Sequence, residues 1–137
     1  MAKRYLLDRK SGKRIVLIDS ITELDACDKG LIVISGSHGG VSVVEYTLRY
    51  PPSLVFLNDA GIGKDNAGIQ ALSVLDQHDV AAATYSHMTA RIGDAEDALR
   101  HGIISCTNTK ARHLGYLVGQ LISDLILCYE RHQTDSV

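Results

Sequence analysis

Four segments of this chain share one pattern, in which a short apolar run ends abruptly in small, polar and charged residues. They are LIVISGSHGG (31–40), SLVFLNDAGIGKDNAG (53–68), VAAATYSHMTARIGD (80–94) and IISCTNTK (103–110). Short apolar runs bounded by such residues are typical of strands buried on both faces of a sheet. If all four strands are parallel, their polar ends meet at the carboxyl edge, where open α/β sheets bind ligands. The pattern therefore predicts a fold and a ligand site together.

Helical spacing of apolar residues between these runs favours an alternation of strands and helices. Residues 4–19 are expected to form two strands around a turn, and the predicted short helices cover 21–27, 41–48, 64–77 and 94–100. This order is typical of an α/β domain, a three-layer sandwich with a mostly parallel sheet of about five strands. The N-terminal strand suits an antiparallel edge. Because the chain has 137 residues, we expect it to form one domain over 1–137.

The last predicted element is a long helix from Thr109 to about Arg131. Its apolar stripe comprises Leu114, Leu117, Leu121, Leu125 and Tyr129, and further apolar positions are Ile122, Ile126 and Cys128. A helix lying on one sheet can bury only one stripe, so the other apolar residues would form an exposed patch. We therefore expect a homo-oligomer that associates through this C-terminal helix.

Composition and charge exclude several classes of protein. The net charge of −2 and the pI of about 6.3 are unlike those of a nucleic-acid-binding domain. No apolar stretch reaches the roughly 18 residues that a transmembrane helix needs, and the N-terminal residues are unlike a secretory signal. We therefore expect neither nucleic acid nor membrane as a partner.

The three cysteines indicate a reducing compartment. Cys27, Cys106 and Cys128 are an odd number and contain no C-x-x-C pair, which argues against a disulfide framework and against a structural zinc site. The expected location is cytoplasmic. Nucleotide-binding motifs are absent from the sequence, and we expect no cofactor. A metal held by His38, Asp59 and His87 is an alternative, but no metal-ligand spacing supports it, so we expect no metal.

The first polar loop, Ser-Gly-Ser-His-Gly-Gly (35–40), combines small residues with one imidazole. A strand, a glycine-rich loop and a helix start together form an anion site, because free N–H groups point outward there. We expect His38 to be an acid, a base or a hydrogen-bond donor. The expected substrate contacts in this loop are Ser35, Ser37, Gly39 and Gly40. The alternative is a tight turn that contains a solvated histidine.

A carboxylate, Asp59, directly follows the second apolar run. At that position it can orient a histidine or accept a substrate proton. Asn58 and Lys64 belong to the same loop and are expected to contact the substrate, and Lys64 adds positive charge for an anionic ligand. The structural alternative gives Asp65 or Asn66 the role of helix N-cap, which leaves Asp59 and Lys64 unexplained.

The third run ends in a segment that carries Ser86, His87 and Arg91. His87 is a second candidate acid or base, and Ser86 is a candidate substrate contact. The planar guanidinium of Arg91 suits a carboxylate or phosphate group. The alternative for Arg91 is an ion pair with Asp94 or Asp97.

The fourth run ends in Cys106 and Asn108. Beside a histidine, the Cys106 thiol could act as a nucleophile, although a small buried apolar side chain is the commoner role of a free cysteine. Asn108 is expected to contact the substrate. With four parallel strands, His38, Asp59, His87 and Asn108 should face one cleft.

Two of the strand ends resemble segments of the caspase-like cysteine peptidases. In that family one apolar strand ends in His-Gly and a later one in Asp-Ala-Cys, and here the matching residues are His38-Gly39 and Asp59-Ala60. The position of the nucleophile is occupied by Gly61. We therefore do not carry the peptidase activity over.

The site residues favour a small cytoplasmic enzyme that acts on a small anionic metabolite, either a carboxylate or an amide. Hydrolysis and proton transfer assisted by histidine and aspartate both suit the predicted catalytic set of His38, Asp59, His87 and Cys106. The alternative is a non-catalytic ligand-binding or regulatory subunit that uses the same pocket.

Overall fold

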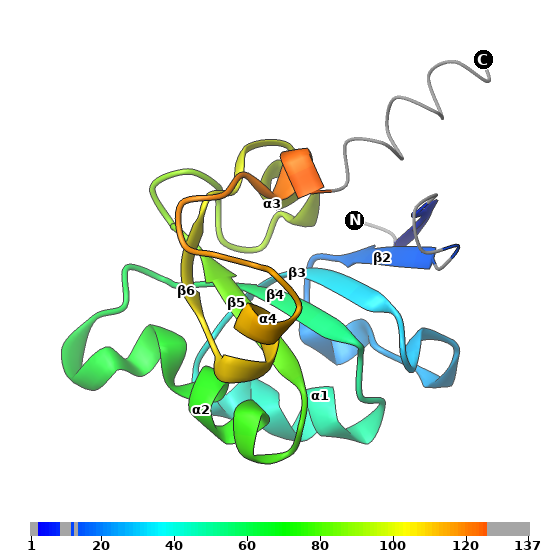
Figure 1. Ribbon diagram of the computed structural model, residues 1–137, viewed down its shortest axis with the longest axis horizontal. Helices are drawn as coiled ribbons and strands as arrows, with labels where there is room; N and C mark the ends of the chain where they lie inside the picture. Colours follow the sequence, from blue (N-terminus) through cyan, green and yellow to red (C-terminus); the bar gives the residue numbers. More distant parts are fainter. Residues whose placement is uncertain (1–2, 9–11, 13, 126–137) are drawn as a thin grey trace.

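A six-stranded sheet organises the computed structural model, which describes residues 3–8, 12 and 14–125 (Figure 1). The strands are adjacent in the order in which they occur along the chain. They are β1 (Arg4–Leu7), β2 (Arg14–Ile18), β3 (Ile32–His38), β4 (Leu54–Asn58), β5 (Ala81–Tyr85) and β6 (Ile104–Thr107). Strands β2 to β5 are parallel, whereas β1 and β6 pair antiparallel with their neighbours. The predicted mixed α/β fold, mostly parallel sheet and antiparallel N-terminal strand are confirmed.

The helices between the strands are shorter than predicted. The segment predicted as a helix over 21–27 forms two 3-10 helices, η1 (Ile21–Glu23) and η2 (Ala26–Asp28). The next two connections each combine a 3-10 helix with an α-helix. These are η3 (Val41–Val43) with α1 (Val44–Arg49), and η4 (Lys64–Ile69) with α2 (Gln70–Gln77). Helix α3 (Ala95–His101) follows β5.

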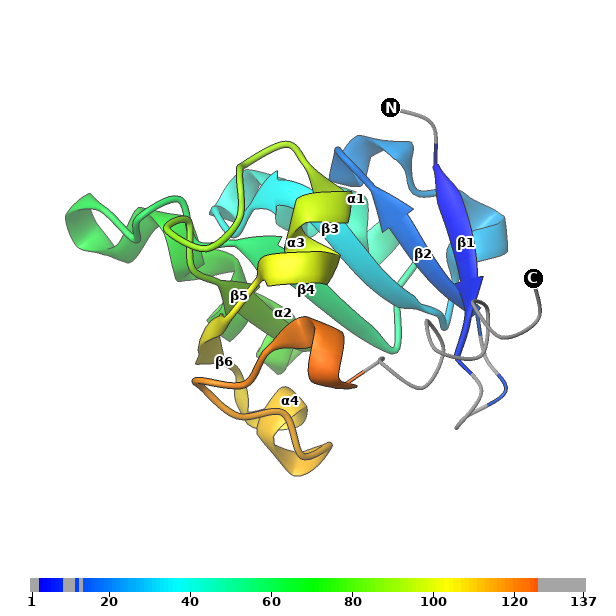
Figure 2. The ribbon, with the colours of Figure 1, turned by 90° about the horizontal axis from the view of Figure 1, so that it is seen from above.

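Strand alternation divides the core into two hydrophobic clusters. In β2, Ile15 and Leu17 belong to the cluster that contains α3, whereas Val16 and Ile18 belong to the cluster that contains α2. Figure 2 shows α3 lying across one face of the sheet and α1 and α2 lying behind the other. Residues that alternate along a strand point to opposite faces, so both faces of the central strands are covered. Across the described residues, no helix has the length and apolar character needed to cross a membrane.

The prediction that the last strand is parallel is wrong. The Ser86 N–H donates to the carbonyl of Ile103 at 2.9 Å, so β6 begins beside the end of β5 and runs back along it. Thr107, near the end of β6, pairs with Ala83. The connection through α3 leaves β5 at its carboxyl end and rejoins the sheet at that same edge, where β6 begins. Asn108, which follows β6, therefore lies at the opposite edge from the carboxyl ends of β3, β4 and β5.

The prediction of one long C-terminal helix is wrong over the described residues. Helix α4 spans only Thr109–His113, and Gly115 and Gly119 follow with φ angles of 96° and 95°. These left-handed conformations end the helix. The chain then turns back, and the N–H of Ile122 donates to the carbonyl of Gly102. Residues 126–131 of the predicted helix lie outside the described residues.

The homo-oligomer was predicted from an exposed face of a long helix, and the turn shows that this helix does not form over the described residues. Ile122, expected on a second exposed helix face, is fully buried in the core. Ile126 and Cys128 lie outside the described residues. The apolar side chains that are exposed instead belong to the turn itself: Leu114, Leu117 and Val118. Association into oligomers stays a prediction, without the helix face from which it was inferred.

Asn108 is a structural clamp, and Asn108→Ala is expected to cost about 2–4 kcal/mol of unfolding free energy. Its carboxamide oxygen accepts from the N–H groups of Ala82 and Ala111, and its nitrogen donates to the carbonyls of Leu72 and Val80. Alanine would remove a hydrogen bond from each of these four backbone groups, which lie in α2, in α4 and at the start of β5. Urea denaturation measures the loss.

The matched control for this prediction is Gln77→Ala, which removes an exposed carboxamide from α2. Its expected effect is within about 0.5 kcal/mol, as for other surface substitutions. Equal effects of the two substitutions would contradict the clamp.

Candidate functional site

The carboxyl ends of three neighbouring strands bring His38, Asp59 and His87 to one edge of the sheet. His38 is in register with Asn58, and Asn58 is in register with Tyr85. Asp59 follows β4 directly, and His87 follows β5 by two residues. Since adjacent strands are about 4.8 Å apart, the ends of β3 and β5 are separated by roughly 10 Å with β4 between them.

The centre of this edge is a pair formed by Asp59 and His87. One carboxylate oxygen of Asp59 lies 3.4 Å from Nδ1 of His87, and the same oxygen accepts from the backbone N–H groups of Gly61 and His87 at 2.8 and 3.0 Å. The Asp59 side chain is 5% exposed, whereas that of His87 is 48% exposed. A buried carboxylate thus lies beside Nδ1 of a half-exposed imidazole.

The pKa of the Asp59 carboxyl is lowered from its ordinary value of 3.8. Burial by itself raises this pKa, but the hydrogen bonds from the Gly61 N–H, the Ser105 hydroxyl and the His87 N–H, together with the charge of His87, lower it by more. Asp59 is therefore ionised at neutral pH. Its negative charge therefore lies next to the His87 ring at neutral pH.

The lowered pKa predicts how Asp59 contributes to stability as the pH changes. A carboxyl with a lower pKa in the folded state stabilises the fold above its ordinary value of 3.8, and this contribution is lost as the pH falls through its folded pKa. Wild-type protein should therefore lose stability more steeply than Asp59→Asn on acidification below about pH 4. Urea denaturation of both proteins over a pH series tests this, and parallel curves would contradict it.

The loop from Asp59 to Gly68 is unusually strained for a connection between a strand and a helix. Its backbone has positive φ at four residues other than glycine: Ala60 (51°), Ile62 (65°), Asp65 (56°) and Asn66 (59°). For a β-branched residue such as Ile62 this conformation is a true outlier. Residues of this kind cost about 1–3 kcal/mol each and concentrate at functional sites. In Figure 2 this loop extends away from the sheet.

A cavity of about 430 Å³ opens between this loop and η3. Its lining includes His38, Ser42, Ile62, Ala67 and Gln70. The N–H of Gly40 donates to Nδ1 of His38 at 3.0 Å, so in the neutral ring the proton is on Nε2. His38 therefore offers a hydrogen-bond donor at the rim of a cavity of small-molecule size.

Several predicted substrate contacts in the first polar loop are occupied within the fold. Ser35 is buried and its hydroxyl accepts from the N–H of Ser37, whose own hydroxyl accepts from the N–H of Ile21. The N–H groups of Gly39 and Gly40 donate to the Asn58 carbonyl and to His38. Predicted anion binding by these two amides is therefore wrong, because both donors are already used.

Asn58 is likewise held inside the protein. It is fully buried, its carboxamide nitrogen donates to the carbonyl of Ala90, and its oxygen accepts from the N–H of Ala60. These bonds fix the start of the strained loop and the segment that follows β5. Asn58 thus supports the segment that carries Asp59, and its carboxamide groups are used inside the protein.

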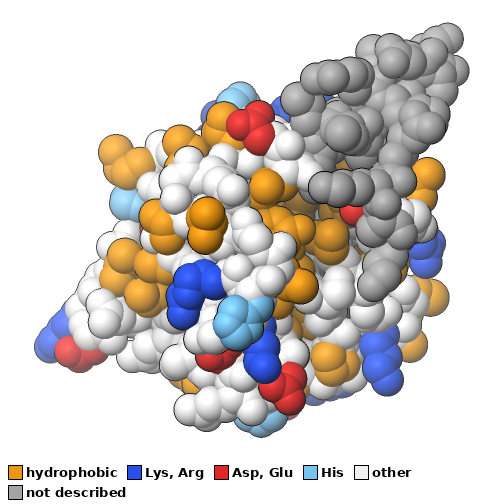
Figure 3. Space-filling view, in the orientation of Figure 1, with side chains coloured by type: hydrophobic (Ala, Val, Ile, Leu, Met, Phe, Trp, Pro, Cys, Tyr) orange, Lys and Arg blue, Asp and Glu red, His pale blue; other side chains and the backbone are white. Residues whose placement is uncertain are grey.

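The two predicted cationic contacts lie on the surface near the edge. Lys64 is exposed at the start of η4. The Arg91 side chain is 83% exposed and its guanidinium lies 3.8 Å from the carboxylate of Asp94, which is the alternative that the sequence offered. The hydroxyl of Ser86 accepts from the N–H of Met88 and shapes the turn that carries His87. On the face shown in Figure 3, basic and acidic side chains are interspersed.

Neither candidate histidine lines the cavity that Cys106 lines. Cys106 is half-buried in β6 and lines this cavity together with residues of α2 and α4. Cys106 pairs with Thr84 near the carboxyl end of β5, and its role as a nucleophile beside a histidine stays a prediction.

Three polar residues of the site were not predicted. Ser105 on β6 helps to lower the pKa of Asp59, and its hydroxyl lies 3.0 Å from that of Thr84. Ser42 and Gln70 line the cavity beside His38. Ser105 reaches Asp59 only because β6 is antiparallel, so the sequence pattern offered no signal for it. Ser42 and Gln70 lie in the predicted helices, at positions where polar residues are common.

Comparisons with known proteins give no family and no function for this chain. No protein-family model, curated protein or solved structure matches this chain. Within the described residues, no group of three or more His, Cys, Asp and Glu side chains is arranged to hold a metal ion.

Proposed function

We propose that this protein is a small enzyme that acts on a small anionic metabolite, a carboxylate or an amide, by hydrolysis or proton transfer. The observation that carries the proposal is the pairing of buried, ionised Asp59 with half-exposed His87 beside a strained loop. A residue with a perturbed pKa and a specific charge partner, next to a cavity, is a functional-site candidate on physical grounds.

In the proposed reaction His87 is the acid–base group. Its Nδ1 faces Asp59, so Nε2 takes the proton from a substrate C–H group or from an attacking water, and later returns it. The Asp59 carboxylate keeps the ring oriented and stabilises the imidazolium formed. His38 donates from its Nε2 to a substrate oxygen on which negative charge develops.

Substrate size and charge follow from the cavity beside His38. Its volume of about 430 Å³ suits a metabolite rather than a polymer segment. Ile62 and Ala67 supply apolar contact, and Ser42 and Gln70 supply hydrogen bonds. The charge of Lys64 at the start of η4 favours an anion at this edge.

A non-catalytic ligand-binding or regulatory subunit is the second candidate function, and one observation favours it. The amides of Gly39 and Gly40 are both used inside the fold, so this loop lacks the pair of backbone donors that commonly holds an oxyanion. A binding protein needs only the cavity and its polar rim. Turnover discriminates the two candidates.

The proposed location, layer arrangement and partners follow the predictions made from the sequence. We place the protein in the cytoplasm, because its cysteines form no recognisable disulfide or zinc pattern. We also propose that the helices on the two faces of the sheet make a three-layer sandwich. Neither nucleic acid nor a membrane is a proposed partner.

The proposal is tested by incubating the protein with panels of small carboxylates and amides in D₂O and following each compound by ¹H NMR. The expected result is hydrolysis of one compound, or exchange of one of its C–H groups with deuterium. The same reaction should be lost with His87→Gln. Saturable binding without any conversion would favour the second candidate function.

A further inference from the structure

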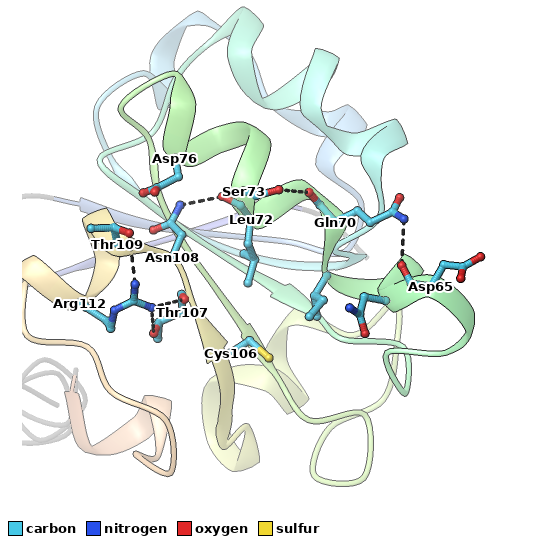
Figure 4. Close-up of a pocket in the computed structure, with 12 residues that line it drawn as sticks. Asp65, Gln70, Leu72, Ser73, Asp76, Cys106, Thr107, Asn108, Thr109 and Arg112 are labelled. Carbon is cyan, nitrogen blue, oxygen red and sulfur yellow. Dashed lines mark hydrogen bonds between the residues drawn. The ribbon is translucent and has the colours of Figure 1, made fainter.

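A second cavity, of about 500 Å³, lies on the α2 face of the sheet between α2, η4, β6 and α4. Figure 4 shows Arg112, Thr107 and Thr109 on one side of it and Asp65 with Gln70 on the other. Leu72 and Cys106 lie between these two groups. The acid–base residues of the proposed active site do not line this cavity.

Arg112 presents a positive charge that is oriented by neutral oxygens. Its Nη1 donates to the carbonyl and the hydroxyl of Thr107 at 2.7 and 3.3 Å, and its Nη2 donates to the hydroxyl of Thr109 at 3.2 Å. Among the described residues, no carboxylate forms an ion pair with this guanidinium. Of its five N–H donors, two remain for a ligand.

The wall beside Arg112 is apolar. Leu72 and Ile69 contribute hydrocarbon surface, and the half-buried Cys106 packs against the same core cluster. A ligand that uses both the guanidinium and this wall combines an anionic group with an apolar body.

The remaining charges of the cavity restrict the kind of anion. Asp65 and Asp76 also line it, and both carboxylates repel an anion. The repulsion between these carboxylates and a doubly charged phosphate would be about twice that for a singly charged anion, and Arg112 alone would offset it. A carboxylate carries a single charge, and its two oxygens match two N–H donors of a guanidinium.

We propose that this cavity is a second ligand site, for a small monocarboxylate with an apolar body. The site is separate from the Asp59–His87 pair and does not depend on the proposed function. Gln70 and the η4 segment lie between the two cavities, and Gln70 lines both. A ligand here therefore binds beside the strained loop without occupying the active site.

The probe for this proposal is benzoate, and benzamide is its uncharged isostere. Titration of ¹⁵N-labelled protein with millimolar benzoate should shift the backbone signals of Ser73, Thr107 and Thr109, and benzamide should bind at least tenfold more weakly. Arg112→Gln should weaken benzoate binding at least tenfold. The control Arg49→Gln, at an exposed arginine of α1 paired with Glu45, should leave the affinity unchanged.

Thiol alkylation in the wild-type protein supplies a second measurement, which needs no variant. Benzoate should slow the reaction of iodoacetamide with Cys106 and leave that with the exposed Cys27 unchanged, as peptide mass spectrometry resolves. Equal affinities for benzoate and benzamide, shifts absent from this cavity, or equal alkylation of Cys106 with and without benzoate would each overturn the proposal.

Discussion

Replacing His87 by glutamine is expected to lower turnover by a factor of roughly 10²–10⁴, the usual contribution of a positioned acid–base group. The fold should be retained, because the His87 side chain is half-exposed and lies outside the core clusters. Its backbone N–H still donates to Asp59 in the variant. Initial rates with the compound found in the NMR screen, together with thermal melting, measure both quantities.

The matched control is His78→Gln, the same substitution at an exposed histidine after the end of α2. Its rate should stay within a factor of two of wild type, because His78 lies next to the start of β5, at the opposite edge of the sheet from His87. If both variants lost activity equally, or if His87→Gln kept full activity, His87 would not be the acid–base group.

Asp59→Asn separates the charge of Asp59 from its structural role. The asparagine oxygen can accept the same N–H bonds from Gly61 and His87, so the loop should stay in place. The negative charge that stabilises the imidazolium is lost. A fall in kcat with little change in KM is therefore expected. The melting temperature should be lower than that of wild type at neutral pH, where ionised Asp59 stabilises the fold, and the difference should shrink as the pH falls below about 4.

The sequence pattern predicted the central strands because each is a local apolar run with a sharp polar end. Their parallel order also brings Asp59 and His87 to one edge, as proposed from the positions of these residues after β4 and β5. The partner strand of β6 could not be predicted in the same way. Its direction depends on the path of residues 86–103 over the sheet, which is set by packing between distant elements.

Helical periodicity failed where glycine conformation decided the outcome. The apolar positions after Thr109 fit a helix, yet Gly115 and Gly119 take left-handed angles and the chain turns back to bury Ile122. Burial of Ile122 against the core offsets the lost helical hydrogen bonds. The spacing of apolar residues along the sequence does not reveal such burial against distant residues.

Gly39, in the first polar loop, was expected to contact a substrate. Gly39 and Gly68 instead let the chain approach itself. A Cβ on Gly39 would lie 2.5 Å from the carbonyl oxygen of Gly68, and a Cβ on Gly68 would lie 1.9 Å from the carbonyl oxygen of Asp59. The two ends of the strained loop are thus in close contact at Asp59, where a side chain on Gly68 would meet the Asp59 carbonyl.

Gly68→Ala is therefore expected to cost about 3 kcal/mol or more in unfolding free energy, because rigid backbone must move to admit the methyl group. Gly63→Ala is the matched control. Gly63 has a φ of 71° and a ψ of −166°, a conformation nearly restricted to glycine, but nothing lies within 4 Å of its Cβ position. Alanine there should therefore cost about 1–3 kcal/mol, from backbone conformation alone. Urea denaturation of both variants compares close packing with backbone conformation in one loop.

The two variants should also differ in function if this contact positions Asp59. At a temperature where Gly68→Ala is still folded, its kcat should fall more than that of Gly63→Ala, because only the first displaces the backbone of the carboxylate that orients His87. Equal losses of stability would contradict the close packing of Gly68 against Asp59. Unequal stabilities with equal kcat values would instead show that the loop tolerates displacement at Asp59, and that the pairing with His87 does not depend on how the loop is closed.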